Sequence, residues 1–199
     1  LSIGQEVAAA AVCESLTRHD HVFSGHRSHA HYLAKGGDLK KMIAELYGKA
    51  TGCSQGFGGS MHLTDIEVGF IGATPIVGSS IPIAVGAALT IKQRNIDKMV
   101  VVFLGDGAME TGAAHESMNF ATVHQLPILF VCENNLYSVY SPLSIRQPAG
   151  RGLCELAKSH GLTAESVMGD DALSVFYRAA ELISLTRKTS QPSFLEVPV

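Results

Sequence analysis

The stretch MVVVFLGDG, residues 99–107, runs from apolar side chains directly into a Gly-Asp-Gly turn. A short continuous apolar run is typical of a strand that is buried on both faces, as in a parallel sheet. We therefore predict a strand over residues 98–104, followed by a helix over residues 112–124. A second apolar run, residues 127–132, ends at the polar sequence Glu-Asn-Asn. Strand, helix and strand joined by short loops predict a parallel β-α-β unit.

Apolar spacing on either side of this unit predicts further helices and one more strand. Helices are expected over residues 8–16, 38–48, 81–93, 150–160 and 171–186, and a strand over residues 193–197. Residues 19–34 are predicted to form a strand end and a loop, and the glycine-rich residues 51–59 a loop. Ser2 and Gln5 resemble a helix capping box. No linker divides the chain, so we expect one domain over residues 1–199, as a fragment truncated at both ends.

The composition argues against several classes of function. The net charge is −3, 17% of the residues are charged, and no run of Lys or Arg suggests a nucleic-acid binder. The four cysteines are scattered without metal-like spacing, and we expect reduced thiols. Residues 68–91 carry no charge, but their glycines and prolines disfavour a membrane span. No signal or transit peptide is visible, so we expect a cytoplasmic protein, or a mitochondrial-matrix protein in a eukaryote.

Two polar side chains, Asp106 and Asn135, follow the two strands of the central unit. Ligands of parallel sheets bind at the carboxyl ends of the strands, where both residues are expected. A hard cation such as Mg²⁺ prefers oxygen ligands, with phosphates completing its shell. A helix beginning just after Gly107 would offer backbone N–H groups to a diphosphate. Each motif alone is also compatible with an ordinary turn or loop.

The combination of Gly105-Asp106-Gly107 with Asn134-Asn135 resembles the thiamine-diphosphate signature of transketolases, decarboxylases and 2-oxo acid dehydrogenases. Four further motifs narrow the resemblance to the alpha subunit of the first component of pyruvate, branched-chain 2-oxo acid and acetoin dehydrogenase complexes. These motifs are CENNxY at 132–137, GGSMH at 58–62, IVG at 76–78 and GQE at 4–6. The resemblance implies an α/β fold in which a parallel, thiamine-diphosphate-binding sheet carries helices on both faces.

The resemblance also implies the ligands of Mg²⁺ and of the cofactor's diphosphate. The carboxylate of Asp106, the side chain of Asn135 and the backbone carbonyl of Tyr137 are implied to hold the metal. The backbone of Gly107 and of Ala108 is implied to contact the diphosphate.

A histidine-rich segment supplies a second implied contact to the diphosphate. Arg27 carries a planar fork that suits a phosphate, and the resemblance places His26 and His29 beside it. The alternative is a solvated loop without a role, to which we assign His19, His21 and His31. A histidine zinc site is disfavoured because no Cys pair lies nearby.

The remaining implied contacts concern the ring system and the substrate. Val77 is expected to pack in the bend of thiamine diphosphate and its backbone segment to hold the aminopyrimidine. Pro75 stands where the family usually has Gly, so a contact there must use the Pro75 carbonyl. His62 is expected to face the substrate channel, although a structural histidine is the alternative. His29 and His62 are the catalytic candidates, and Met61 is expected in the core.

The implied activity is oxidative decarboxylation of a pyruvate-like 2-oxo acid, with transfer of the acyl group to a lipoyl-bearing acyltransferase. The glutamate that activates the cofactor is implied to come from a beta-type subunit, and Glu133 is no substitute. The apolar residues 69–88 are predicted to form an interface in a heterotetramer. Residues 141–148 depart from the pyruvate-type pattern, so acetoin cleavage is an alternative. Two others are a transketolase-like transferase and a binding protein that has lost catalysis.

Overall fold

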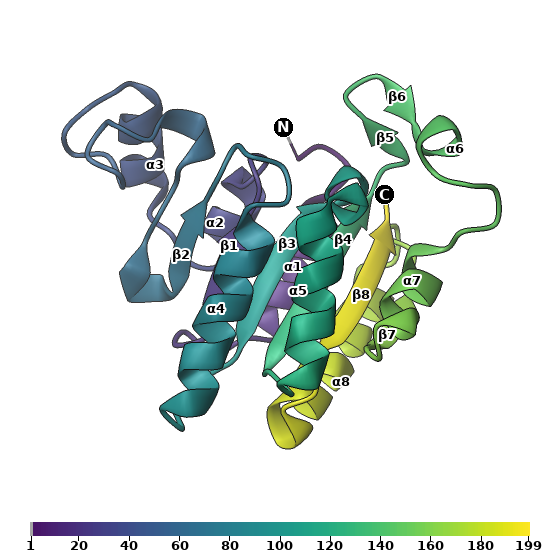
Figure 1. Ribbon diagram of the computed structural model, residues 1–199. Helices are drawn as coiled ribbons and strands as arrows, with labels where there is room; N and C mark the ends of the chain where they lie inside the picture. Colours follow the sequence, from purple (N-terminus) through teal and green to yellow (C-terminus); the bar gives the residue numbers. More distant parts are fainter. Residues whose placement is uncertain (1) are drawn as a thin grey trace.

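The computed structural model describes residues 2–199 and has a six-stranded parallel sheet at its centre (Figure 1). The strand order is β2-β1-β3-β4-β8-β7. The strands are β1 (His21–Ser24), β2 (Phe70–Ala73), β3 (Val100–Gly105), β4 (Ile128–Asn134), β7 (Thr163–Ser166) and β8 (Ser193–Pro198). Every neighbouring pair in this sheet is parallel. The predicted α/β fold is confirmed, and the two strands of the central unit lie side by side.

Helices cover both faces of the sheet, as the resemblance implies (Figure 1). On one face lie α4 (Ser80–Gln93), α5 (Gly112–Val123) and α7 (Leu153–Ser159), and on the other α1 (Glu6–Glu14) and α8 (Ala172–Thr189). Successive side chains of a strand point to opposite faces. Val100 and Val102 of β3 therefore join the first core, and Val101 and Phe103 join the second. This division explains why residues 99–104 are apolar at every position.

The smaller elements lie along or beyond the edges of the sheet. They are α2 (His29–Ala34), α3 (Leu39–Leu46), α6 (Leu143–Arg146), β5 (Tyr137–Ser138), β6 (Ser141–Pro142), and 3-10 turns at Gly59–Met61, Ile66–Val68 and Asp106–Glu110. The antiparallel pair β5-β6 and α6 project from the edge at which the strands of the main sheet end (Figure 1). Asp38 begins α3 by accepting a hydrogen bond from the backbone N–H of Lys41 at 2.9 Å.

Most predicted elements are present with shifted ends, but some local predictions were wrong. The capping box is absent. No side-chain hydrogen bond caps α1 at Gln5, and the backbone N–H of Gln5 donates to the backbone carbonyl of Ser2 and not to its hydroxyl. The expected loop in residues 19–34 contains the helix α2. The strands β2 and β7 were not predicted. The helix expected just after Gly107 is a 3-10 turn, and α5 starts at Gly112.

The order of the strands defines where the sheet changes direction. From β1 the chain moves to β2 on one side and then returns to β3 on the other side. Ligands of open parallel sheets bind at such a switch point, outside the carboxyl ends of the strands. The segments that follow β1 and β3 begin at Gly25 and Asp106. The topology therefore brings the histidine-rich segment and the Gly-Asp-Gly motif to the same place.

The apolar segment 69–88 divides between core and surface. Ile81, Ala84 and Val85 of α4 are buried against the sheet. Ile76 and Ile83 are 69% and 58% exposed, respectively. The segment is therefore partly an ordinary core, and only its exposed side is left for the predicted interface. Among residues 2–199, no helix combines the length and the apolar character that crossing a membrane requires.

Candidate active site

A cavity of about 520 Å³ opens at the carboxyl edge of the sheet, at the switch point. Its wall includes every residue that the sequence assigned to cofactor or metal binding. These residues are His26, Arg27, Pro75, Val77, Asp106, Gly107, Ala108, Asn135 and Tyr137. They come from four segments that are far apart in the chain. The fold thus gathers the predicted binding residues in one place, although their individual roles stay predictions.

The two side chains predicted to hold the metal follow neighbouring strands. Asp106 follows β3 directly and is 2% exposed, and Gly105 is paired with Glu133 across β3 and β4. Asn135 follows β4, and its side-chain oxygen accepts the backbone N–H of Tyr137 at 3.0 Å. The preceding residue, Asn134, is turned away and donates to the carboxylate of Glu196 at 2.8 Å. Of the two asparagines, only the second lines the cavity.

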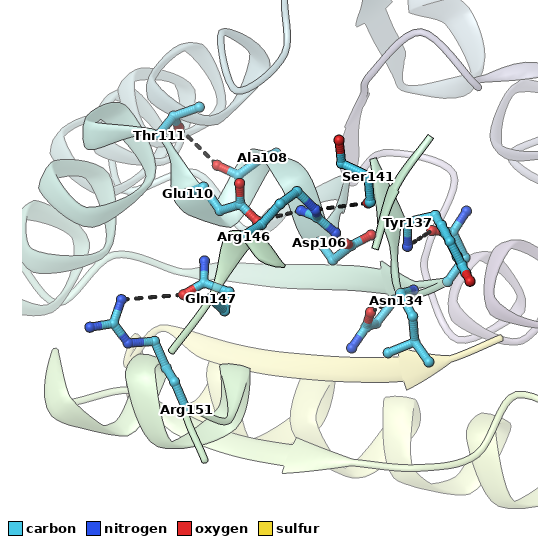
Figure 2. Close-up of polar contacts among 12 residues, drawn as sticks. Asp106, Ala108, Glu110, Thr111, Asn134, Tyr137, Ser141, Arg146, Gln147 and Arg151 are labelled. Carbon is cyan, nitrogen blue, oxygen red and sulfur yellow. Dashed lines mark hydrogen bonds and ion pairs between the residues drawn. The ribbon is translucent and has the colours of Figure 1, made fainter. Parts of the chain in front are cut away.

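Arg146 is paired with the buried carboxylate of Asp106 (Figure 2). The guanidinium of Arg146 also pairs with Glu110 and donates from Nε to the backbone carbonyl of Ser141 at 3.1 Å. A buried carboxylate needs a counter-charge, and Arg146 supplies it from α6. The guanidinium pairs with Oδ2 of Asp106, so a metal ion that took that oxygen as a ligand would displace it. Sequence reasoning missed Arg146, because it lies in the stretch that departs from the family pattern and carries no motif.

The glycine after Asp106 is explained by packing. A Cβ at Gly107 would lie 2.7 Å from the Ser138 hydroxyl, so a larger residue would require the Ser138 side chain to shift. At Gly105 the nearest neighbour of such a Cβ is the Glu133 carbonyl at 4.0 Å, which leaves room for a ligand. A glycine lets a bulky phosphate come close to the backbone. The space exists at Gly105, whereas Gly107 is needed for contact with Ser138.

The segment after β1 contributes an arginine and a histidine to the cavity. His26 and Arg27 are both exposed and line its wall. Within residues 2–199, Arg27 forms no ion pair. A planar cation on a cavity wall with a free fork suits an anionic ligand.

The two catalytic candidates lie outside the cavity wall. His29 Nε2 is 2.7 Å from the Ser60 hydroxyl, and His62 Nδ1 is 3.1 Å from the Gly58 carbonyl. Neither residue lines the cavity, so nothing in their placement supports a catalytic role, which stays a prediction. Met61 was expected in the core, but it is 46% exposed and lines the cavity.

The glycine-rich loop that carries these residues is organised by one buried carboxylate. Glu45 of α3 is 1% exposed and accepts four backbone N–H groups, from Ser54, Gly56, Gly58 and Gly59, at 2.7–3.0 Å. Burial raises the pKa of Glu45, but these four donors together hold the pKa below its ordinary value of 4.5. The ionised form of Glu45 therefore fixes the loop and the position of Met61.

We expect Glu45→Gln to lower the free energy of unfolding by about 2–4 kcal/mol, because an amide nitrogen would face backbone donors that now point at oxygen. The wild-type contribution is complete above about pH 4.5 and is lost as the pH falls through the lower pKa of the folded state. Chemical denaturation at pH 7 and at pH 3.5 measures both effects. The exposed Glu14→Gln is the control, and an equal response of both variants would contradict the account.

Metal-binding clusters of the usual kind are absent from the part of the chain that the structure describes. Among residues 2–199, no three His, Cys, Asp or Glu side chains converge. The cavity wall does carry carboxylate and amide side chains, which supply the oxygen ligands that Mg²⁺ prefers.

Comparison with known proteins gives the chain a family. The model of a family described as "Dehydrogenase E1 component" matches residues 1–199. The chain is 41% identical over 196 residues to the alpha subunit of acetoin:2,6-dichlorophenolindophenol oxidoreductase from Bacillus subtilis, and the match covers 98% of this chain and 59% of that protein. It is 37% identical over 197 residues to the alpha subunit of the pyruvate dehydrogenase E1 component from Rickettsia felis, covering 99% and 60%.

The fold is also that of a solved enzyme. Transketolase from Campylobacter jejuni superimposes with a TM-score of 0.72 at 18% identity, over 94% of this chain and 32% of that one. At this identity the likeness concerns the fold alone. The chain spans about three fifths of the length of the two curated relatives.

Proposed function

The chain belongs to the dehydrogenase E1 component family, and on this basis we propose that it binds thiamine diphosphate with Mg²⁺ as the alpha-type part of a 2-oxo acid dehydrogenase. One observation carries the proposal. Asp106 follows β3, Asn135 follows β4 and Arg27 follows β1. All three residues line one cavity at the switch point of the sheet. The chemistry of these groups fits a metal-bridged diphosphate.

The residues on the cavity wall are of the chemical types that Mg²⁺ and thiamine diphosphate require. The Asp106 carboxylate, the Asn135 amide oxygen and the Tyr137 carbonyl are the oxygen ligands that Mg²⁺ prefers. Arg27 adds a free cation for the phosphates, and the space beside Gly105 lets them approach the backbone. Val77 and Pro75 line the same wall, where they would contact the ring system. A metal ion bound to Oδ2 of Asp106 would displace Arg146.

When bound, thiamine diphosphate supplies the carbon nucleophile for the 2-oxo carbonyl and stabilises the electron pair that decarboxylation leaves behind. The chain's own residues have the simpler tasks of holding and orienting. Asp106, Asn135 and Tyr137 fix the metal, and Arg27 neutralises phosphate charge. Val77 gives the cofactor an apolar surface against which to bend.

A partner subunit is needed to complete the site. The acidic residues on the described cavity wall are Asp106 and Glu133, and both are paired, with Arg146 and His31 respectively. Both carboxylates are engaged within the chain, which supports what the resemblance implies: the group that activates the aminopyrimidine comes from a beta-type subunit. Val139 and Tyr140 line the cavity while 82% and 92% exposed, which is consistent with cover by a partner.

The substrate class is a small 2-oxo acid such as pyruvate, with acyl transfer to a lipoyl-bearing acyltransferase. Acetoin cleavage is the second candidate, because one relative above is named for acetoin and the other for pyruvate. Co-expression with a beta-type subunit, followed by assay of 2-oxo acids and acetoin with a dye acceptor, separates the two. Reduction of added lipoamide tests the acyltransferase step, and its failure together with sugar-phosphate transfer would favour a transketolase-like enzyme.

We expect Arg27→Ala to weaken thiamine diphosphate binding about ten- to hundredfold, since a charge-assisted contact contributes about 1.5–3 kcal/mol. Arg27→Lys should lose less, because the charge stays while the planar fork is lost. Calorimetric titration in excess Mg²⁺ measures both variants. Arg151→Ala is the matched control, because Arg151 donates to Gln147 and lies off this cavity. An unchanged dissociation constant for Arg27→Ala would favour the alternative interpretation, in which this segment is a solvated loop without a role.

A further inference from the structure

His31 is a buried side chain that connects two strands which are not neighbours. It is 3% exposed. Its Nδ1 is 2.8 Å from the hydroxyl of Ser24, and its Nε2 is 3.0 Å from the carboxylate of Glu133. The imidazole also stacks on Phe103, with ring centroids 3.9 Å apart and planes 17° apart. The assignment of His31 to a solvated loop was wrong, because the side chain is buried in α2 and both ring nitrogens have partners.

The three contacts of His31 belong to three adjacent strands of the sheet. Ser24 is the last residue of β1, Phe103 lies in β3, and Glu133 lies near the end of β4. Because β3 separates β1 from β4 in the sheet, His31 reaches across β3 and ties its two neighbours together. The histidine itself comes from α2, so the link also fixes that helix to the edge of the sheet.

The segments that leave these two anchor points carry the proposed cofactor ligands. Arg27 comes three residues after Ser24, and Asn135 comes two residues after Glu133. His31, Ser24 and Glu133 line the same cavity as Arg27 and Asn135. The position of the Arg27 segment relative to the Asn135 loop thus depends on two hydrogen bonds that meet at one imidazole.

An ordinary structural role for His31 is the simplest alternative. Buried polar pairs are often no better for stability than well-packed apolar residues of the same size, because desolvation offsets their attraction. Such groups contribute chiefly by fixing one arrangement of the surrounding chain. The cross-strand geometry of His31 matches that kind of contribution, because its anchors lie directly beside the two halves of one site.

We propose that His31 is a positioning residue that sets the Arg27 segment against the Asn135 loop, so that phosphate clamp and metal ligand engage one diphosphate together. The inference rests on the proposed function, since it names what the two segments hold. His31 itself touches neither metal nor phosphate in this role. It acts through Ser24 on one side and through Glu133 on the other.

Ser24→Ala tests the link with little disturbance, because it removes the hydroxyl that His31 contacts and leaves the His31–Glu133 pair intact. One hydrogen bond of this kind corresponds to about a two- to tenfold change in affinity. We expect that loss for thiamine diphosphate in excess Mg²⁺, measured at a temperature at which each variant is fully folded. His31→Gln, whose amide can still reach Glu133, should behave in the same way. His31→Leu removes both bonds and should lose more.

The sharper readout is the coupling between Ser24 and Arg27. If the link positions Arg27, then Arg27→Ala should cost less affinity in the Ser24→Ala background than in the wild type. A purely structural role predicts instead that the two losses add. His21→Leu is the matched control, because His21 starts the same strand at the opposite edge of the sheet, and it should leave the affinity unchanged.

The outcomes separate this inference from the proposed function. A wild-type protein that binds no thiamine diphosphate with Mg²⁺ overturns both. Normal binding by the wild type, together with unchanged affinity in Ser24→Ala and His31→Gln or strict additivity with Arg27→Ala, overturns the positioning role alone. Weakened, non-additive binding by variants that are folded at the temperature of the titration supports it.

Discussion

Asp106→Ala is expected to abolish Mg²⁺-dependent binding of thiamine diphosphate. The substitution removes the only carboxylate in the proposed metal shell, and the remaining amide and carbonyl oxygens carry no charge. Even changes behind the ligands of a metal site cost roughly 10- to 100-fold in affinity, so we expect a loss of at least about a hundredfold here. Calorimetric titration of the cofactor at several Mg²⁺ concentrations measures the loss and its dependence on the metal.

Glu110→Gln is the control for this experiment. Glu110 pairs with the same arginine as Asp106, yet it does not line the cavity. A loss caused merely by freeing Arg146 should appear in both variants, whereas loss of a metal ligand should appear only in Asp106→Ala. Retention of wild-type affinity by Asp106→Ala would refute the metal assignment, whatever the control does.

The second large effect concerns turnover. The purified chain alone should show no measurable decarboxylation of a 2-oxo acid, because both acidic residues on its described cavity wall are already paired. Addition of a beta-type subunit should raise the rate by at least about 10²–10⁴, the usual contribution of a positioned general acid or base. A dye-reduction assay on the separate and the mixed subunits measures this difference.

Light scattering on the same samples tests the assembly on which turnover depends. We expect activity to coincide with a species that contains both types of subunit, arranged as a heterotetramer. A monodisperse chain that decarboxylates pyruvate without any beta-type sequence would contradict both the interface and the missing carboxylate. A mixed assembly without activity toward any 2-oxo acid or acetoin would contradict the proposed substrate class.

The sheet's centre could be predicted from sequence because its strands are buried on both faces. β3 and β4 are apolar at almost every position, and each ends at an abrupt polar motif. Since the carboxyl ends of parallel strands share one edge, the residues assigned to cofactor binding had to meet there. This is why an assignment made from motifs alone is matched by one continuous cavity wall.

The edge strands could not be predicted in the same way. β7 reads Thr-Ala-Glu-Ser, with only Ala164 buried, and β2 contains a glycine within a charge-free stretch. Each is an edge strand that pairs with one neighbour only, so it lacks the continuous run of apolar residues that marks a central strand. α2 was missed for a related reason, because its six residues HAHYLA show no helical period and it is held by tertiary contacts.

Pairings between side chains that are far apart in the chain also could not be predicted from the sequence. The contact between Arg146 and Asp106 joins positions 40 residues apart, and that between His31 and Glu133 joins positions 102 residues apart. A carboxylate at the end of a buried strand does signal the need for a partner, and Glu133 carried that signal. Nothing in the local pattern identified which histidine would meet it.

A crystal structure of the chain soaked with thiamine diphosphate and Mn²⁺, with anomalous scattering to locate the metal, tests the central claim most directly. Mn²⁺ takes the same oxygen ligands as Mg²⁺. We predict one anomalous peak bonded to the Asp106 carboxylate, the Asn135 side-chain oxygen and the Tyr137 carbonyl, bridged to the diphosphate, with Arg146 displaced from Asp106. Cofactor bound in this cavity without a metal at Asp106, or a metal peak elsewhere on the chain, would contradict the account.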